Sequence, residues 1–197
     1  MPSNKDLKRL VRERMAATGE LYTQALTHIL QEEPLRPLPS PWFLTGSRSD
    51  EYEIGLVEQS VVRLRLRAGV EHASGFGALM QSISARRHLG GRVRFAARMR
   101  AYEVSTWAGL WLRIDSRDEA LALDNMQDRP LRGTADWTLM EIVLEVPEEA
   151  TSLHFGALLT GPGAIDLTDL ELHATDQEIT TRESTLPEEP QNLTFQA

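Results

Sequence analysis

The sequence contains no cysteine, which excludes a disulfide framework, thiol catalysis and a cysteine-ligated zinc site. No apolar run approaches the roughly 20 residues that a membrane-spanning helix requires. Residues 1–30 also lack the continuous apolar segment and the small-residue cleavage site of a secretory signal peptide. These absences lead us to expect a cytoplasmic protein that does not associate with a membrane.

The chain also lacks an excess of positive charge. Its 197 residues have a formal net charge of −8, which disfavours non-specific binding of nucleic acid by the chain as a whole. With 41% hydrophobic and 25% charged residues, the composition is that of an ordinary globular protein, and the length allows one sizeable domain with extensions.

Residues 1–31 are expected to form a pair of short helices, because apolar residues recur at helical spacing on either side of Thr18-Gly19. Two helices of this length have little stability alone, so they must pack on the next domain or on another copy or partner. Four basic residues of the first helix are candidates for contact with DNA or a protein partner: Lys5, Lys8, Arg9 and Arg12. In residues 1–40, however, six Lys/Arg oppose five Asp/Glu, so an ordinary solvated helix face is favoured over nucleic-acid binding.

Residues 32–41 contain four prolines and are expected to form a stiff, extended linker. From residue 42 the helical period gives way to short alternating or apolar stretches separated by Gly, Pro, Asp or Asn. This pattern predicts a mainly β protein, with an antiparallel β-sandwich of the jelly-roll type over 42–175. Within it, residues 62–66 alternate Leu or Val with Arg and are expected to form a half-exposed strand. Residues 176–197 are acidic and are expected to be a disordered tail.

The stretch 107–115 alternates strictly and is predicted to be the central strand. Its even-numbered residues are apolar and should face the core, whereas its odd-numbered side presents Trp107, Trp111 and Arg113. Indole rings can stack on a sugar, and a guanidinium can bind a carboxylate, a phosphate or vicinal hydroxyls. We expect Gln81, Arg98 and Asn125 to share this side, which would give a groove for a small polar ligand such as a carbohydrate. The alternative is that both tryptophans pack under a loop or against the N-terminal helices.

No pattern indicates catalysis, a cofactor or a metal. The five histidines are scattered without metal-ligand spacing, and Ser82 and Ser84 have no evident base partner. The turn 124–130 concentrates amides and carboxylates, but it lacks the ordered spacing of a calcium loop, so a well-satisfied turn is favoured. We therefore expect a non-enzymatic protein with no catalytic residue, no metal and no cofactor.

Several phrases of the sequence together resemble a bacterial jelly-roll module of galactose-binding-like type. They are Trp42-Phe-Leu-Thr-Gly-Ser, Tyr52-Glu-x-Gly55, Gly75-Phe-Gly-x-Leu-Met-Gln81, Trp107-Ala-Gly-Leu-Trp-Leu-Arg113, Asp124-Asn-Met-Gln-Asp-Arg-Pro130 and Phe155-Gly-x-Leu-Leu-x-Gly161. The resemblance covers about 42–175, and similar modules are also found attached to AraC-type transcriptional regulators. It implies a binding module, with a regulator-like protein as the alternative, in which the helices contact DNA or a partner and the sandwich is the sensor. Residues 1–31 are too short for a complete AraC-type DNA-binding domain.

Overall fold

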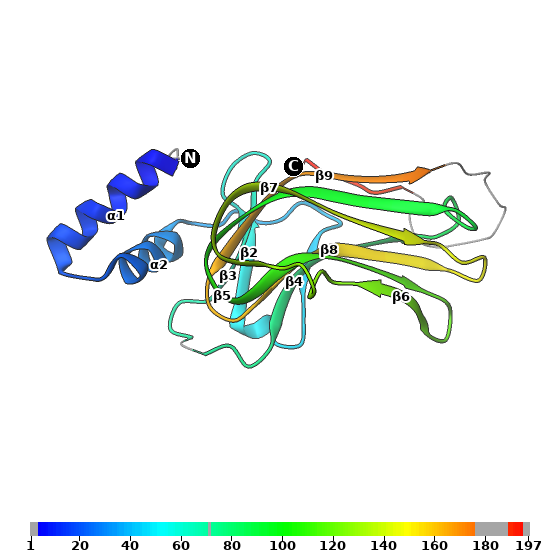
Figure 1. Ribbon diagram of the computed structural model, residues 1–197, viewed down its shortest axis with the longest axis horizontal. Coiled ribbons are helices and arrows are strands. Elements are labelled where there is room, and N and C mark those ends of the chain that lie inside the picture. Colours follow the sequence, from blue (N-terminus) through cyan, green and yellow to red (C-terminus); the bar gives the residue numbers. More distant parts are fainter. Residues whose placement is uncertain (1–3, 71, 176–188, 195–197) are drawn as a thin grey trace.

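Residues 4–70, 72–175 and 189–194 are described in a computed structural model (Figure 1). The chain begins with two helices, α1 (Asn4–Thr18) and α2 (Tyr22–Glu32), and a one-turn helix at Ser49–Glu51 follows later. The strands are β1 (Phe43–Thr45), β2 (Tyr52–Leu56), β3 (Val62–Leu66), β4 (Phe76–Ser84), β5 (Arg92–Asp115), β6 (Ala120–Asp124), β7 (Leu131–Glu145), β8 (Ser152–Thr160) and β9 (Ala164–Thr175).

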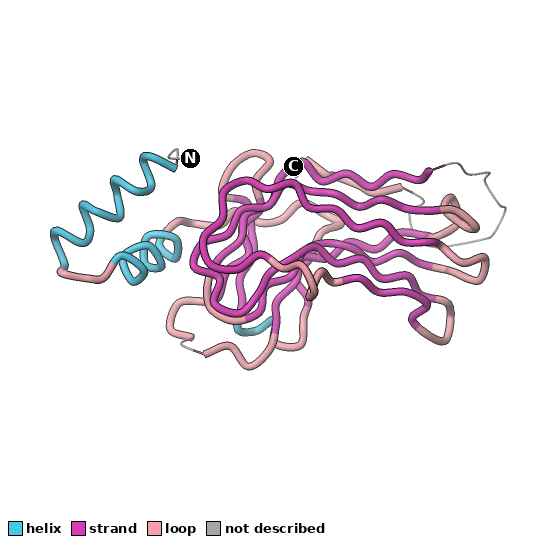
Figure 2. Tube along the Cα trace, in the orientation of Figure 1, coloured by secondary structure: helices cyan, strands magenta, loops and turns pink. Residues whose placement is uncertain are grey.

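Every strand pairing in the described chain is antiparallel, in the order β1-β4-β8-β5-β9-β3-β2, and both β6 and β7 also pair with β5. Figure 2 shows the strands gathered into one body, with the helix pair projecting from one end. The prediction of an antiparallel jelly-roll sandwich preceded by two helices is confirmed. Neither helix is long and apolar enough, in the described ranges, to cross a membrane.

Strand β5 runs through both halves of the sandwich. Its first part pairs with β7 and β9, and its last part pairs with β8 and β6. The side chains of β5 that belong to the main core are at odd positions up to Ala101 and at even positions from Val104, and the change coincides with a shift of register against β7. Glu103, at this point, has a φ of 47°. Because side chains alternate along a strand, the irregularity turns both parts toward the same core.

The core lies between the two halves of β5. All four even-numbered residues of the stretch 107–115 are fully buried, as predicted for that side. Phe155 of β8 packs edge-on against two other rings, Trp42 at 5.6 Å and Phe95 at 5.1 Å between ring centroids. Phe155 of β8 therefore connects Trp42, just before β1, with Phe95 in the first part of β5.

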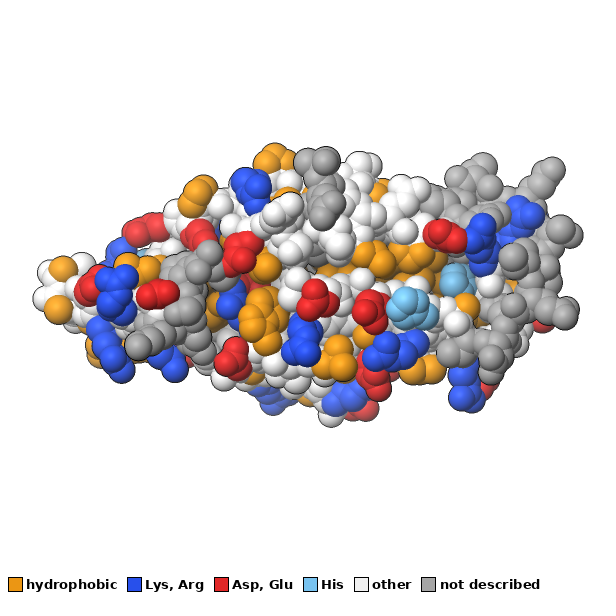
Figure 3. Space-filling model, turned by 90° about the horizontal axis from the view of Figure 1, so that it is seen from above, with side chains coloured by type: hydrophobic (Ala, Val, Ile, Leu, Met, Phe, Trp, Pro, Cys, Tyr) orange, Lys and Arg blue, Asp and Glu red, His pale blue; other side chains and the backbone are white. Residues whose placement is uncertain are grey.

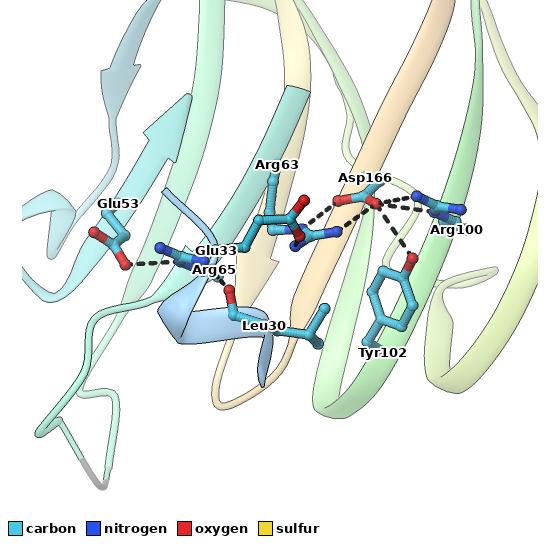
Figure 4. Close-up of polar contacts among 8 residues, drawn as sticks. All are labelled: Leu30, Glu33, Glu53, Arg63, Arg65, Arg100, Tyr102 and Asp166. Atoms are coloured by element: carbon cyan, nitrogen blue, oxygen red, sulfur yellow. Dashed lines mark hydrogen bonds and ion pairs between the residues drawn. The ribbon is translucent and has the colours of Figure 1, made fainter. Parts of the chain in front are cut away.

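The two arginines of β3 contradict the prediction of a half-exposed strand, because Arg63 is only 1% and Arg65 only 4% exposed. Arg63 donates to both carboxylate oxygens of Asp166 at 2.7 and 2.9 Å (Figure 4). Arg65 donates to Glu53 at 2.7 Å and also to the carbonyl of Leu30, at the end of α2. The helix pair covers this side of the strand, so the arginines are sealed in a polar interface rather than solvated.

The helices are packed against the sandwich, one of the two outcomes expected for them. Tyr102 and Ala164 of the sandwich join a small apolar cluster with side chains of both helices, among them Val11 and Leu26. Just after α2, Glu33 accepts a hydrogen bond from Arg63 at 2.5 Å. An apolar contact and a buried polar one therefore fix the helix pair to the same end of the sandwich.

The outer surface of β5 and its neighbours carries paired charges. Arg92 contacts Glu145 at 2.9 Å and Arg94 contacts Glu141 at 2.6 Å, and both pairs are largely exposed. On the face seen from above, Figure 3 shows basic and acidic side chains intermingled. Positive charge on these strands is therefore offset locally by carboxylates.

Part of the expected disordered tail lies against the sandwich. The carbonyl of Asn192 accepts a hydrogen bond from the Trp42 indole at 3.0 Å, and Leu193 packs against the core. Residues 189–194 therefore contradict the expectation of a disordered tail for this part of the chain. The remaining tail residues, 176–188 and 195–197, lie outside the described residues.

Candidate functional site

A pocket of about 370 Å³ opens on the face of the sheet formed by β1, β4, β8, β5 and β6. Three of the six residues expected to form a ligand groove line it, namely Trp111, Arg113 and Asn125. The other lining residues are Thr45, Gly46, Phe76, Ala78, Met80, Leu123 and Leu158. None of the lining residues comes from α1 or α2, so the helix pair does not cap this face.

Strand register explains why these side chains meet. Arg113 of β5 lies opposite His154 of β8 and opposite Leu123 of β6, and His154 in turn lies opposite Ser82 of β4. Side chains that are directly opposed on neighbouring antiparallel strands project to the same side of the sheet. The odd-numbered side of the stretch 107–115 is thereby continued across four neighbouring strands as the floor of the pocket.

Trp111 forms the centre of that floor. Its indole is only 9% exposed and packs against Ala78 and Leu158, while its N–H donates to the carbonyl of Leu79 at 3.1 Å. Gly156, directly opposite on β8, leaves space for this contact, because a Cβ there would collide with the same carbonyl. The ring is therefore fixed in place with one surface facing the pocket.

Trp107 lies beside the pocket. It is partly buried against the cluster that contains Trp111 and does not line the cavity. Both rings pack against side chains of neighbouring strands rather than against the N-terminal helices, and only Trp111 also borders the cavity.

The expected position of Gln81 is wrong. Gln81 lies opposite Phe155, a core residue, and is fully buried on the core side of β4. Its amide exchanges two hydrogen bonds with the backbone of Gln191, at 2.7 and 2.8 Å. The sequence of β4 mixes small, apolar and polar residues on both sides, so alternation alone did not indicate which side faces the core.

The expected position of Arg98 is also wrong. Arg98 lies on the other half of β5, where it pairs with β7 and β9. Its exposed guanidinium is 3.8 Å from Asp169, and it does not line the pocket. The irregularity of β5 around Glu103 lies between Arg98 and Trp111, so the two side chains are on different parts of the sheet. This irregularity has no clear signature in the sequence.

Arg113 gives the pocket one polar end, and a chain of polar side chains that do not line the cavity continues behind it. Arg113 donates to Asp115 at 2.8 Å, and the same carboxylate oxygen lies 3.3 Å from Nε2 of His154. Nδ1 of His154 lies 2.7 Å from the hydroxyl of Ser82, and its Nε2 lies 3.0 Å from that of Ser152. Burial lowers the pKa of His154, opposed by the charge of Asp115 and assisted by that of Arg113.

This chain corrects the expectation that Ser82 has no base partner. His154 lies between two fully buried core residues, Leu153 and Phe155, so its side chain points to the other side of β8. What the sequence did not indicate was the order of the strands, which places β4 and β5 on either side of β8. Ser82 and His154, which reach Arg113 through Asp115, are therefore residues beside the site that sequence reasoning missed.

The turn 124–130 forms part of the rim of the pocket, because its residue Asn125 lines the cavity. Its carboxylates and amides are engaged: Asp124 accepts from the Met126 N–H at 2.9 Å and from Arg129 at 2.5 Å. Met126 is buried over Gly109, where an added Cβ would lie 3.0 Å from its side chain. The turn is thus satisfied by its own contacts, and no cluster of three or more His, Asp or Glu suited to a metal is found in the described ranges.

The rest of the rim is apolar. Phe76 and Leu123 line the cavity while remaining exposed to solvent, and Phe43, also exposed, lies opposite the lining residue Met80. Exposed large apolar side chains that gather around one hollow are typical of a binding surface. The pocket therefore combines an apolar rim, an aromatic floor and one polar end.

No protein-family model matches the chain. It is 32% identical over 165 residues to the uncharacterized HTH-type transcriptional regulator YbfP of Bacillus subtilis (strain 168), a match that covers 79% of this chain and 56% of that protein. The expected resemblance to a protein labelled a transcriptional regulator is thereby confirmed, although the chain spans little more than half of this relative.

Two solved structures are similar to most of the chain. The enzymatically active domain of tailspike protein 4 of bacteriophage CBA120 matches with a TM-score of 0.52 and 14% identity, covering 74% of this chain and 20% of that one. At this identity the likeness to the tailspike domain concerns the fold alone. The CBM22-1 xylan-binding domain of Paenibacillus barcinonensis Xyn10C matches with a TM-score of 0.47 and 11% identity, covering 73% of this chain and 91% of that one.

Proposed function

We propose that the protein is a non-enzymatic binding module whose jelly roll takes a small polar ligand, such as a carbohydrate, in the pocket over Trp111. The observation that carries the proposal is the arrangement of one fixed indole on the floor with the Arg113 guanidinium beside it. A sugar ring has an apolar C–H face and hydroxyl edges, so it can lie on an aromatic ring while its hydroxyls bond to polar groups at one end.

Arg113 is the member of the site best suited to a test. Its side chain lines the pocket and is 42% exposed, so its removal acts on the pocket more than on the core. Hydrogen bonds that involve a charged group are worth about 1.5–3 kcal/mol, so Arg113→Ala should weaken ligand binding about tenfold or more. A panel of neutral mono- and oligosaccharides is screened by thermal shift on the intact chain, and affinities are then measured by calorimetry for the wild type and the variant.

Arg98→Ala is the matched control, because it removes another exposed arginine of β5 that does not line the pocket. We expect this control to bind as the wild type does. Trp111→Phe keeps an aromatic floor and should reduce affinity less than Arg113→Ala does. Equal affinity of the Arg113 and Arg98 variants, or no stabilisation of the wild type by any sugar at millimolar concentration, would contradict the proposal.

A second candidate function is a regulator-like protein whose helices contact DNA or a protein partner and whose sandwich is the sensor. The likeness to YbfP favours it, together with the exposed basic residues Lys8, Arg9 and Arg12 on α1. Arg9 is paired with Glu13 at 2.9 Å, and the side chain of Lys5 lies outside the described part. Because the helices are fixed to the sandwich by buried contacts, a change in the sandwich has a physical route to them.

For this second candidate, the double variant Lys8→Glu/Arg12→Glu should weaken binding to duplex DNA at least tenfold in a gel shift at low salt, since it replaces two positive charges by negative ones. Arg117→Glu, a charge reversal in the exposed turn before β6, serves as the control. If the wild type, the double variant and the control shift DNA equally, or none shifts it, the helices have no role in DNA binding.

A further inference from the structure

The polar end of the pocket has hydrogen-bonding capacity that its own residues do not fill. One oxygen of Asp115 serves both Arg113 and His154, while its other oxygen is buried without a partner among the described residues. Nε of Arg113 is likewise buried without a partner, although the side chain as a whole is 42% exposed. A single contact at 2.8 Å therefore holds the guanidinium at Asp115.

His154 competes for the same carboxylate. A carboxylate only accepts hydrogen bonds, so the neutral imidazole carries its proton on Nε2, facing Asp115 and Ser152, and Nδ1 accepts from the hydroxyl of Ser82. A second proton would go to Nδ1, where the oxygen of Ser82 at 2.7 Å can accept it. The histidine is thus placed so that both of its protonation states keep their hydrogen bonds.

We propose that the protonation state of His154 sets the charge of this pocket, so that it binds carboxylate-bearing ligands more tightly when His154 is protonated, whereas neutral ligands bind equally in both states. This inference rests on the proposed function, because it concerns the ligand class that the same pocket accepts.

The charges of the three groups give the reason. With neutral His154, the positive Arg113 and the negative Asp115 cancel, and an anionic ligand would have to compete with Asp115 for the guanidinium. With protonated His154, the imidazolium balances Asp115, and the charge of Arg113 is available to the ligand. Asp115 and Arg113 are the charged groups that act on His154 in the described chain, and Ser82 and Ser152 are its other polar contacts.

The sign of the pH dependence follows from linkage. Burial lowers the pKa of His154, so the empty pocket holds the neutral ring at neutral pH. A ligand carboxylate favours the imidazolium, and therefore its binding raises the pKa of His154 and takes up a proton. Affinity for an anionic ligand must then rise as the pH falls, by about tenfold for each unit by which the ligand raises that pKa. Affinity for a neutral ligand has no such dependence.

The first arm of the test uses the intact chain without a ligand. NMR titration between pH 8 and 5 follows the ring signals of His154 together with the Nε–H signal of Arg113. We expect the Arg113 signal to shift with the midpoint of His154, and to stop doing so in His154→Gln, which retains a polar side chain but does not titrate there. His173→Gln, at an exposed histidine of β9, is the control and should leave the Arg113 titration unchanged. An Arg113 signal that ignores His154 would overturn the inference.

The second arm compares two matched sugar pairs, galactose with galacturonate and glucose with glucuronate, whose carboxylates stay ionised from pH 8 to 5.5. The uronate should bind about tenfold more tightly at pH 5.5 than at pH 8 in the wild type and His173→Gln, and show no trend in His154→Gln. The neutral sugar should change less than about twofold throughout. A uronate affinity independent of pH in the wild type, or one that keeps its trend in His154→Gln, would overturn the inference. If neither sugar of either pair binds, the proposed function fails, and the first arm alone decides whether His154 controls Arg113.

Discussion

Replacement of Asp166 by asparagine should lower the free energy of unfolding by about 3–5 kcal/mol, the usual cost of removing one partner of a buried ion pair. Asp166 is fully buried and accepts hydrogen bonds from Arg63 at 2.7 and 2.9 Å and from Arg100 at 2.9 Å. The hydroxyl of Tyr102 lies 3.3 Å from the same carboxylate, and burial raises the pKa of that phenol, which keeps its proton for donation. Asparagine has nearly the same shape, but it leaves the buried Arg63 with Glu33 as its one remaining carboxylate partner among the described residues and turns an NH₂ donor toward other donors.

The measurement is urea unfolding at pH 7, followed by far-ultraviolet circular dichroism. Glu145→Gln is the matched control, because it removes an exposed carboxylate from its pair with Arg92, and it should cost less than about 0.5 kcal/mol. The loss should also reach the helix pair, since Arg63 bonds to Glu33 just after α2, so the amides of α2 should exchange faster in the Asp166 variant. A cost for Asp166→Asn as small as that of the control would mean that the arginines are paired or hydrated without it.

The strands could be predicted because alternation is a local property. The even-numbered side of 107–115 is apolar throughout and is fully buried in the structure, and the odd-numbered side brings Trp111 and Arg113 into one pocket. Each of these conclusions needs only the period of two along one strand and the rule that apolar side chains face the core.

The predictions that were wrong concern features that depend on contacts between distant segments. The alternation of β3 is the same whether its arginines face water or a covering helix. In the structure they are buried because the helix pair covers them. Arg98 and Arg113 share one strand, but the irregularity at Glu103 directs them to different surfaces. Ser82 and His154 meet only because β4 lies beside β8. Strand order and strand irregularities are therefore the information that one sequence did not supply.

A side chain at Gly156 should damage both the fold and the pocket. Gly156 lies opposite Trp111, and a Cβ there would collide with the carbonyl of Leu79, the acceptor of the indole N–H. Relief requires the Leu79 carbonyl of β4 to move away from β8, which also disturbs its hydrogen bond with the indole, and overpacking of this kind costs about 1–3 kcal/mol. Gly156→Ala should therefore lower stability to urea by that amount, shift the tryptophan emission to the red and abolish the ligand binding proposed for the pocket.

Two further variants show whether the Trp111 contact is the cause. Gly109→Ala adds a Cβ on the same side of the sheet, but its nearest neighbour is the side chain of Met126 at 3.0 Å, so a smaller loss is expected. Trp111→Phe removes the N–H bond to Leu79 and should cost about 1 kcal/mol alone. Because phenylalanine has no N–H to hold the Leu79 carbonyl against the added Cβ, the cost of Gly156→Ala should shrink by at least about 0.5 kcal/mol in the Trp111→Phe background. Strict additivity of the two costs would mean that the glycine is required by the β4–β8 backbone alone and that the indole has no part in it.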